Sequence, residues 1–207
     1  MMSGKRWGYV VQFFCLLVFL GMSPFLIKMD GRKTRSVSSD SVRSQNVSDE
    51  VKPVVALTFD DGPNASSTPI LLDGLKERKV RATFFLIGEN VEKDENEKIV
   101  KRMYEEGHLI GNHTYTHCNL SKLETGEAKK ELEQTDTVIE KITGKQPVFV
   151  RAPYGELPVD SEQDLNRIYI GWTVDPLDWM TEDTGAVVKT VVEEINPGDV
   201  ILLHDCY

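Results

Sequence analysis

Six short apolar runs, separated mostly by helical patterns, restrict the folds open to this chain more than any other feature. The runs lie at residues 54–59, 82–88, 108–111, 147–150, 169–174 and 200–203. The longest helical pattern, with apolar positions from Ala128 to Ile142, ends at Gly144, a residue typical of helix C-termini. Strands that alternate with helices favour a parallel α/β sheet or barrel, whose ligand site lies beyond the carboxyl ends of the strands.

The chain ends at Tyr207, four residues after the last apolar run, and no helical pattern covers that run. We therefore expect one domain at 53–207, with a parallel α/β sheet or barrel that looks unfinished at its C-terminal end. Unless something covers it, an exposed apolar strand at Val200–Leu203 would favour instability or aggregation.

The N-terminal region differs from this domain in both hydropathy and charge. Residues 7–27 carry no charge, and a helix of that length spans roughly 30 Å of hydrocarbon. We expect a transmembrane signal-anchor helix there, after a short flank at 1–6. A cleaved signal peptide is the alternative, although Gly21–Pro24 is a poor cleavage sequence. The Ser-rich residues 28–52 have almost nothing apolar to bury and are typical of a disordered linker.

Charge argues against one class of partner. Seven basic and four acidic residues precede Val51, whereas 17 basic and 29 acidic residues lie from Val51 onward. A domain with a net charge of −12 offers no basic surface to phosphate groups, so we expect no nucleic-acid partner.

Metal-compatible side chains follow three of the apolar runs, where strands give way to loops. They are Asp60-Asp61, the His113-x3-His117 pair and His204-Asp205. Alone, an H-x3-H pair is as typical of two surface histidines as of a metal site, and Asp60-Asp61-Gly62-Pro63 is also a turn sequence. Together they favour a site of two imidazoles and one carboxylate, which suits Zn²⁺ but also Co²⁺, Ni²⁺ or Fe²⁺.

Five ordered segments resemble the motifs of the polysaccharide deacetylases of carbohydrate esterase family 4, the NodB homology domain. The segments are TFDDGP at 58–63, HTYTH at 113–117, RAPYG at 151–155, DPLDW at 175–179 and LLHD at 202–205. The resemblance covers residues 54 to 205, and five motifs in order make it specific. It implies the distorted (β/α) barrel of the polysaccharide deacetylases, here without its last helix and strand. One position departs from the family pattern, because Ala152 stands where the third motif usually has proline. We expect activity to survive this change in loop stiffness.

The resemblance implies a metal centre with an adjacent base. Asp61, His113 and His117 would hold a divalent metal ion, with zinc first and cobalt or nickel as alternatives. Asp60 would be the base that activates water for attack on an N-acetyl carbonyl, and Arg151 would pair with Asp60 and keep it ionised.

The resemblance also implies an acid and a substrate pocket. His204 would protonate the leaving amine, and Asp178 would raise the pKa of His204. The backbone N–H of Tyr154 would donate to the oxyanion, while Trp179 and Leu202 would wall the acetyl pocket, although ordinary packing also explains the last two.

Four further residues receive structural interpretations. We expect Asp205 to cap or brace its loop, and His108 to be a structural or surface histidine. Cys118 follows one metal ligand directly and Cys206 comes two residues after His204; unpaired thiols are the default expectation for both.

These observations predict a membrane-anchored, metal-dependent hydrolase that removes acetyl groups from polysaccharides containing N-acetylglucosamine. Peptidoglycan is the expected polymer, because a tethered domain on the extracytoplasmic face needs its substrate near the bilayer; chitin-like oligomers remain possible. One alternative is an O-acetyl esterase of the xylan type. The other is a truncated, non-catalytic glycan-binding domain, which would bind sugar without releasing acetate.

Overall fold

The computed structural model describes residues 53–93, 95–158 and 166–206. The expected flank at 1–6, transmembrane helix at 7–27 and linker at 28–52 lie outside these residues and stay predictions. Within the described ranges, no helix is both long enough and apolar enough to cross a membrane.

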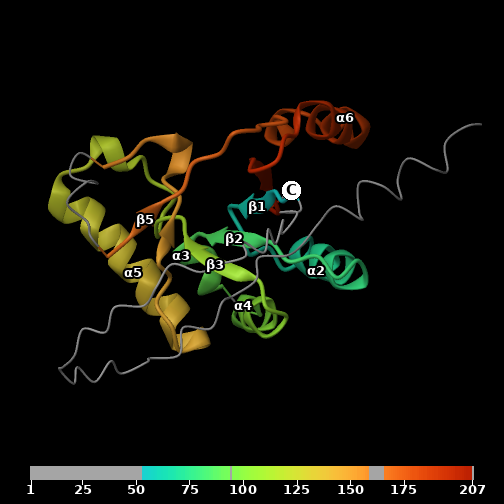
Figure 1. The fold of residues 1–207 in the computed structure, drawn as a ribbon. Helices are drawn as coiled ribbons and strands as arrows, with labels where there is room; N and C mark the ends of the chain where they lie inside the picture. The colour runs from blue at the N-terminus through green and yellow to red at the C-terminus, as the bar shows by residue number, and fades with distance from the viewer. Residues whose placement is uncertain (1–52, 94, 159–165, 207) are drawn as a thin grey trace, which may run out of the picture. The chain divides into compact units, whose positions relative to one another are not determined.

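A curled, fully parallel sheet forms the centre of the fold (Figure 1). Its strand order is β5-β4-β3-β2-β1-β6, so the first and last strands of the described residues lie side by side. The strands are β1 Ala56–Asp60, β2 Thr83–Leu86, β3 Leu109–Asn112, β4 Phe149–Val150, β5 Ile168–Tyr169 and β6 Val200–His204. Each lies within or next to one of the six apolar runs, which confirms the α/β class.

Helices lie between most successive strands, as is usual in a parallel sheet, but between β4 and β5 the described residues contain only a 3₁₀ turn. They are α2 Thr68–Glu77, α3 Gly88–Val91, α4 Asn96–Glu105, α5 Thr125–Thr143 and α6 Thr184–Glu194, with short 3₁₀ turns η1 Leu120–Lys122, η2 Pro153–Gly155 and η4 Asp178–Met180. The helix predicted to end at Gly144 does so, because Gly144 adopts the left-handed conformation with φ 73° directly after α5.

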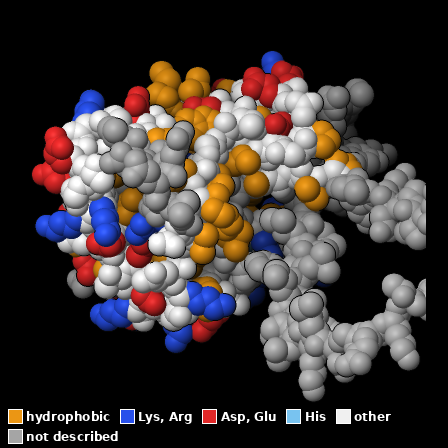
Figure 2. Space-filling model, turned by 60° about the vertical axis from the view of Figure 1, so that its left-hand side comes forward, with side chains coloured by type: hydrophobic (Ala, Val, Ile, Leu, Met, Phe, Trp, Pro, Cys, Tyr) orange, Lys and Arg blue, Asp and Glu red, His pale blue; other side chains and the backbone are white. Residues whose placement is uncertain are grey.

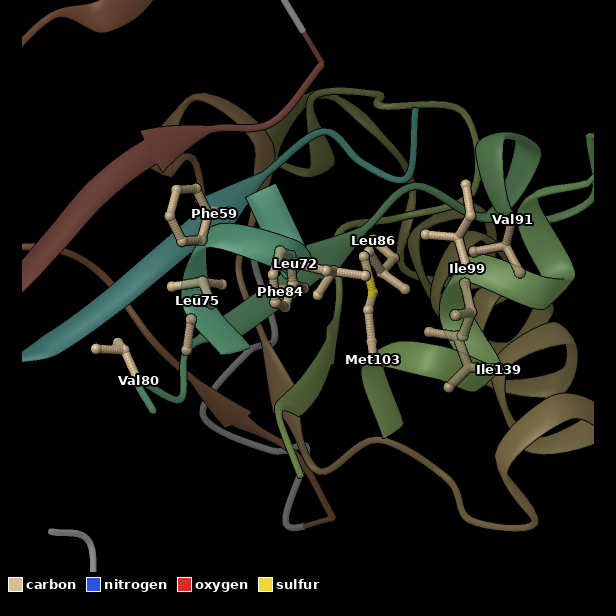
Figure 3. Packing of buried hydrophobic residues seen from close by; sticks show 12 residues of the cluster. Phe59, Leu72, Leu75, Val80, Phe84, Leu86, Val91, Ile99, Met103 and Ile139 are labelled. Atoms are coloured by element: carbon tan, nitrogen blue, oxygen red, sulfur yellow. The ribbon is translucent and has the colours of Figure 1, made fainter. Parts of the chain in front are cut away.

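The main hydrophobic core lies between one face of the sheet and helices α2, α4 and α5 (Figure 3). Phe59 of β1 and Phe84 of β2 stack with ring centroids 5.4 Å apart. Leu72 of α2 and Met103 of α4 pack in the same cluster and are fully buried. Burial of each such side chain contributes about 1.5–3 kcal/mol, so this layer holds β1 and β2 in place below the polar side chains at their ends.

The opposite face of the strands is lined by polar as well as apolar groups. Because successive residues of a strand point to opposite faces, Thr58 and Asp60 point away from Phe59 and its core. Arg151, immediately after β4, reaches both of these residues with its guanidinium group. The interior of the curled sheet is therefore a buried polar site.

The fifth predicted strand is shorter than expected. The run 169–174 was predicted as one strand, but β5 ends at Tyr169, and Val174 instead forms an isolated parallel bridge with Ile201 of β6. Thr173 and Val174 both donate backbone hydrogen bonds to the carbonyl oxygen of Val200. The run thus bends across from one edge of the curled sheet to the other, which divides its pairing between two strands.

Residues 173–174 cover the last apolar run, so the condition under which that strand would be exposed is not met. Ile201 is fully buried and Leu202 is 5% exposed.

Exposed apolar side chains occur elsewhere, and several groups of them interrupt the charged surface drawn in Figure 2.

Candidate metal centre

Two of the predicted polar clusters meet at the carboxyl ends of neighbouring strands. In the register of β1 with β6, Asp60 lies directly opposite His204. Asp61 follows β1 with a φ of 71°, a left-handed conformation that turns its side chain away from the line of the strand. Adjacent aspartates therefore face different neighbours: Asp60 is buried in the interior, whereas Asp61 points toward the histidine loop.

Asp61, His113 and His117 come together as the sequence predicted. Their candidate ligand atoms all lie within 4.8 Å of one another. Asp61 Oδ1 is 3.3 Å from His113 Nε2 and 3.2 Å from His117 Nε2, yet this buried oxygen forms no hydrogen bond within the described residues. Three candidate donor atoms that converge in this way fit a divalent cation, and two imidazoles with one carboxylate suit zinc, cobalt or nickel.

The orientation of His113 strengthens this fit. His113 Nδ1 lies 2.7 Å from the carbonyl oxygen of Arg151, which can only accept a hydrogen bond. The proton of a neutral imidazole must then be on Nδ1, and Nε2 presents its lone pair toward Asp61. His117 has a weaker partner, because its Nδ1 lies 3.4 Å from the hydroxyl oxygen of Tyr154.

The two aspartates differ in their protonation. Burial raises the pKa of Asp61, but the adjacent His113 and His117 outweigh it and hold that pKa far below its ordinary value. Burial also raises the pKa of Asp60, and here the opposing charges of His113 and Arg151 do not fully offset it. Asp61 is thus a permanent anion suited to a cation, whereas Asp60 has the higher proton affinity that a base needs.

Arg151 connects several parts of the site and is 1% exposed. Its Nη1 donates to Asp60 Oδ1 at 2.8 Å and to Thr58 Oγ1 at 2.6 Å, while Nη2 donates to the carbonyl oxygen of Gly171. The guanidinium also lies 4.3 Å from the ring centroid of Phe85. The expected Arg151–Asp60 pair therefore exists, and the other contacts fix the guanidinium in one orientation.

His204 and Asp178 also form the expected pair. Asp178 Oδ1 lies 2.8 Å from His204 Nδ1, and Asp178 Oδ2 accepts the backbone N–H of His204 at 2.8 Å. Burial lowers the pKa of His204, but the bond to Asp178 outweighs it and raises the pKa above its ordinary value. This arrangement favours a protonated imidazole beside Asp60.

The three residues expected to bind substrate lie in different environments. Tyr154 is 66% exposed and Trp179 is 49% exposed, whereas Leu202 is buried. Tyr154 has a φ of 62°, and its ring packs edge-on against His117 with centroids 5.1 Å apart. Trp179 directly follows Asp178 in η4, and Leu202 lies two residues before His204, on the same face of β6. All three are therefore adjacent in sequence or in space to the polar residues of the site.

Two of the structural interpretations are confirmed. Asp205 braces its loop, because its Oδ2 accepts a hydrogen bond from Thr68 Oγ1 at 2.7 Å. His108 is buried, and its Nδ1 accepts the backbone N–H of Ala82. Cys118 and Cys206 form no disulfide with each other.

Two supporting residues, Thr58 and Asn112, are not among the predicted site residues. Thr58 Oγ1 accepts from Arg151 and donates to the carbonyl oxygen of Ile201. The side chain of Asn112 accepts the backbone N–H of Thr114 and donates to Asp136 of α5. Each lies two positions or fewer before a predicted site residue, and Thr58 also begins the TFDDGP segment.

The geometry thus places a proton acceptor and a proton donor on neighbouring strands, beside a three-donor cation site. Neighbouring strands lie about 4.8 Å apart, so Asp60 and His204 can contact groups on one small substrate from two sides. This arrangement suits water-mediated hydrolysis of an acyl group with protonation of its leaving atom.

Comparison with known proteins agrees with this chemistry. A family model described as polysaccharide deacetylase matches residues 48–170. The peptidoglycan-N-acetylglucosamine deacetylase of Bacillus cereus is 44% identical over 156 residues, which make up 74% of this chain and 56% of that protein. The peptidoglycan-N-acetylmuramic acid deacetylase PdaC of Bacillus subtilis is 38% identical over 167 residues, 81% of this chain and 35% of that protein. The chain therefore spans between about a third and about half the length of these curated relatives.

Solved structures share the curled fold. The structure of peptidoglycan deacetylase PdaC from Bacillus subtilis matches with a TM-score of 0.71 and 39% identity, covering 75% of this chain and 76% of that chain. A family 4 acetyl xylan esterase from Clostridium thermocellum, in complex with a cobalt ion, matches with a TM-score of 0.69 and 34% identity over 73% of each chain.

Proposed function

Since the chain belongs to the polysaccharide deacetylase family, we propose that it hydrolyses N-acetyl groups on polysaccharides built from N-acetylhexosamine units, with peptidoglycan as the substrate. The observation that carries this proposal is the convergence of two paired groups on one cation site. Asp60 is paired with Arg151, and His204 is paired with Asp178. A glycan-binding domain needs neither pair.

Asp61, His113 and His117 hold the metal ion in this proposal. When bound, a divalent ion supplies Lewis-acid polarisation of the acetyl carbonyl and favours ionisation of water. We propose zinc, with cobalt and nickel as alternatives, because all three ions accept this set of donors.

The chain's own residues divide the proton transfers. Asp60 takes the proton from the attacking water, and the Arg151 guanidinium orients the Asp60 carboxylate toward it. His204, held by Asp178, donates its proton to the departing amine nitrogen, so that acetate and a free amine result. Tyr154 and Trp179 border the sugar as exposed aromatic side chains, and the Tyr154 backbone N–H donates to the carbonyl oxygen as negative charge develops there.

The choice of polymer draws on the relatives. The Bacillus cereus protein is a peptidoglycan-N-acetylglucosamine deacetylase, and others that match are chitooligosaccharide deacetylases. The likeness to an acetyl xylan esterase favours O-acetyl hydrolysis as a second candidate. Acetylated xylan therefore belongs in the same experiment.

Acetate release from peptidoglycan, N-acetylglucosamine oligomers and acetylated xylan tests the proposal on the full chain with added Zn²⁺ or Co²⁺. We expect metal-dependent release from the N-acetylated substrates and a loss of about 10³-fold or more in kcat for Asp60→Asn, which removes the base but none of the metal ligands. Release from xylan alone would support the esterase. Sugar binding by folded, metal-loaded protein without any release would support the non-catalytic alternative.

We also propose that residues 7–27 anchor the domain on the extracytoplasmic side of a membrane. The support is the length of that uncharged segment. Resistance of the chain to carbonate extraction from membranes, together with protease access to the domain in intact cells, tests this proposal; recovery in the soluble fraction would contradict it.

A further inference from the structure

The segment between the two histidine ligands has an unusual backbone that something must hold. Thr114 has a φ of 65° and His117 has a φ of 57°, and neither is glycine. Residues in this left-handed region cost of order 1 kcal/mol each and persist only when surrounding contacts determine them. The positions of both imidazoles depend on this backbone, since His113 and His117 lie at its two ends.

The carbonyl groups of the segment are held by helix α3. Gly88 N–H donates to the carbonyl oxygen of Thr114, and Glu89 N–H donates to that of Tyr115, both at 3.0 Å. On the amide side, Asn112 accepts only the first N–H, that of Thr114. The next two amides need another acceptor.

Glu131 of α5 is that acceptor. Its Oε2 accepts the backbone N–H of Tyr115 at 3.0 Å, the backbone N–H of Thr116 at 2.8 Å and the hydroxyl of Thr116 at 3.1 Å. One carboxylate oxygen thus receives three hydrogen bonds from two consecutive residues. Such charge-assisted bonds are about twice as strong as neutral ones.

We propose that Glu131 is a positioning residue for the metal centre. By fixing residues 115–116, it sets the separation of His113 and His117, so that both Nε2 atoms face Asp61 Oδ1. Glu131 is not one of the three candidate ligands, which are Asp61, His113 and His117 among the described residues. This inference depends on the metal site of the proposed function but not on its substrate or reaction.

A purely structural role for Glu131 makes a different prediction. If the carboxylate only stabilised the fold, its removal would lower the free energy of unfolding and leave the geometry of the histidines unchanged. If it positions the ligands, its removal weakens metal binding and alters the ligand field of the metal, even in protein that remains folded.

The experiment measures Zn²⁺ affinity by competition with a chelator, and the visible absorption of Co²⁺, in the full chain. Glu131→Ala removes all three bonds, and we expect a loss of about 10- to 100-fold in Zn²⁺ affinity, the range typical when groups that orient metal ligands are lost, together with a changed Co²⁺ spectrum. Glu131→Gln keeps an acceptor oxygen and loses only the charge, so its loss should be smaller.

Glu133 provides the matched control, because it lies two residues further along α5 and is exposed. The only side-chain pair that its carboxylate makes within the described residues is the surface contact with Lys129 at 3.5 Å. Glu133→Ala and Glu133→Gln should keep wild-type Zn²⁺ affinity within about twofold.

Unfolding of the metal-free proteins separates the two roles. Folded Glu131→Ala with wild-type Zn²⁺ affinity and Co²⁺ spectrum would overturn the proposal. If Glu131→Ala does not fold, the Zn²⁺ affinities of Glu131→Gln and Glu133→Gln are compared instead. Equal affinities of these two variants would overturn the proposal. Wild-type protein that binds Zn²⁺ but releases no acetate would refute the proposed function and leave this result standing.

Discussion

Asp178 accepts two hydrogen bonds from one residue, His204, and thereby controls both the position of that imidazole and its proton. The bond to Nδ1 leaves Nε2 as the nitrogen that can donate to a substrate, and the raised pKa keeps that proton in place to a higher pH. In the proposed reaction, protonation of the leaving group by His204 would thus depend on Asp178, a residue that need not touch the substrate.

Asp178→Asn tests this dependence through the pH profile. Because the hydrogen bond and charge of Asp178 raise the pKa of His204, their loss lowers it, and His204 loses its proton at a lower pH. We expect the alkaline limb of kcat/KM to move to lower pH, with a fall of roughly tenfold or more at pH 8. His204→Gln is the control, because it removes the titrating imidazole and with it the alkaline limb of the pH profile. An unchanged alkaline limb in Asp178→Asn would show that His204 is not the titrating acid.

At the scale of elements, α5 supports the site over a long distance. It is 19 residues long, it supplies Leu132 to a second apolar cluster together with Val150 and Ala152, and it supplies Asp136 to the side chain of Asn112. An added Cβ at Gly126 or Gly144, near its two ends, contacts no site residue, so changes in helix stability there can be separated from chemistry.

The same substitution should have opposite effects at two glycines, Gly126 in α5 and Gly144 directly after it. Gly144 follows the helix with φ 73°, whereas Gly126 lies in its first turn, and an added Cβ meets no atom within 4 Å at either position. Gly144→Ala should cost about 1 kcal/mol because of its positive φ, and Gly126→Ala should stabilise by up to about 1 kcal/mol. Urea unfolding measures both; shifts of the same sign would contradict this account of the helix end.

For the molecule as a whole, the contact between the first and last strands carries an electrostatic cost. Asp205 follows β6, is 5% exposed and lies beside Gly62 of the loop after β1. Burial, reinforced by the charges of Asp61 and Asp60, raises the pKa of Asp205 to about 6. A raised pKa in the folded state means that stability from this group is full below about pH 4 and is lost as the pH rises through about 6.

Asp205→Asn should remove this pH dependence while it keeps an acceptor for Thr68. We expect the free energy of unfolding of metal-free Asp205→Asn, relative to wild type, to increase by about 1 kcal/mol between pH 5 and pH 8. Denaturant unfolding of both proteins at the two pH values measures it. Parallel stability curves would mean that Asp205 does not titrate in this range.

Much of the site could be predicted because short sequence motifs contain the residue types that its chemistry needs. Carboxylate and imidazole side chains, as in Asp61, His113 and His117, are typical ligands of zinc and similar metals. Parallel strands bring their carboxyl ends to one edge of a sheet, so side chains that follow different strands can meet there. The Arg151–Asp60 and His204–Asp178 pairs came from the family resemblance and are present as hydrogen bonds. Glu131 could not be found in this way, because a glutamate on an amphipathic helix has no local feature that distinguishes it from Glu133.

The sequence by itself therefore determined the order of strands and helices and the end of α5 at Gly144, since each depends on local residue type and spacing. Residue type also predicted a site of two imidazoles and one carboxylate, whereas the choice of Asp61 as the carboxylate came from the family resemblance. Only the tertiary structure decided that the run 169–174 bends across to β6, that Thr58 and Asn112 support the site, and that Glu131 reaches the loop between the histidines. Those features depend on contacts between residues far apart in the chain, as in the pair Thr58 and Arg151. Local periodicity carries no information about such contacts, because they form only when the sheet curls and brings its strand ends together.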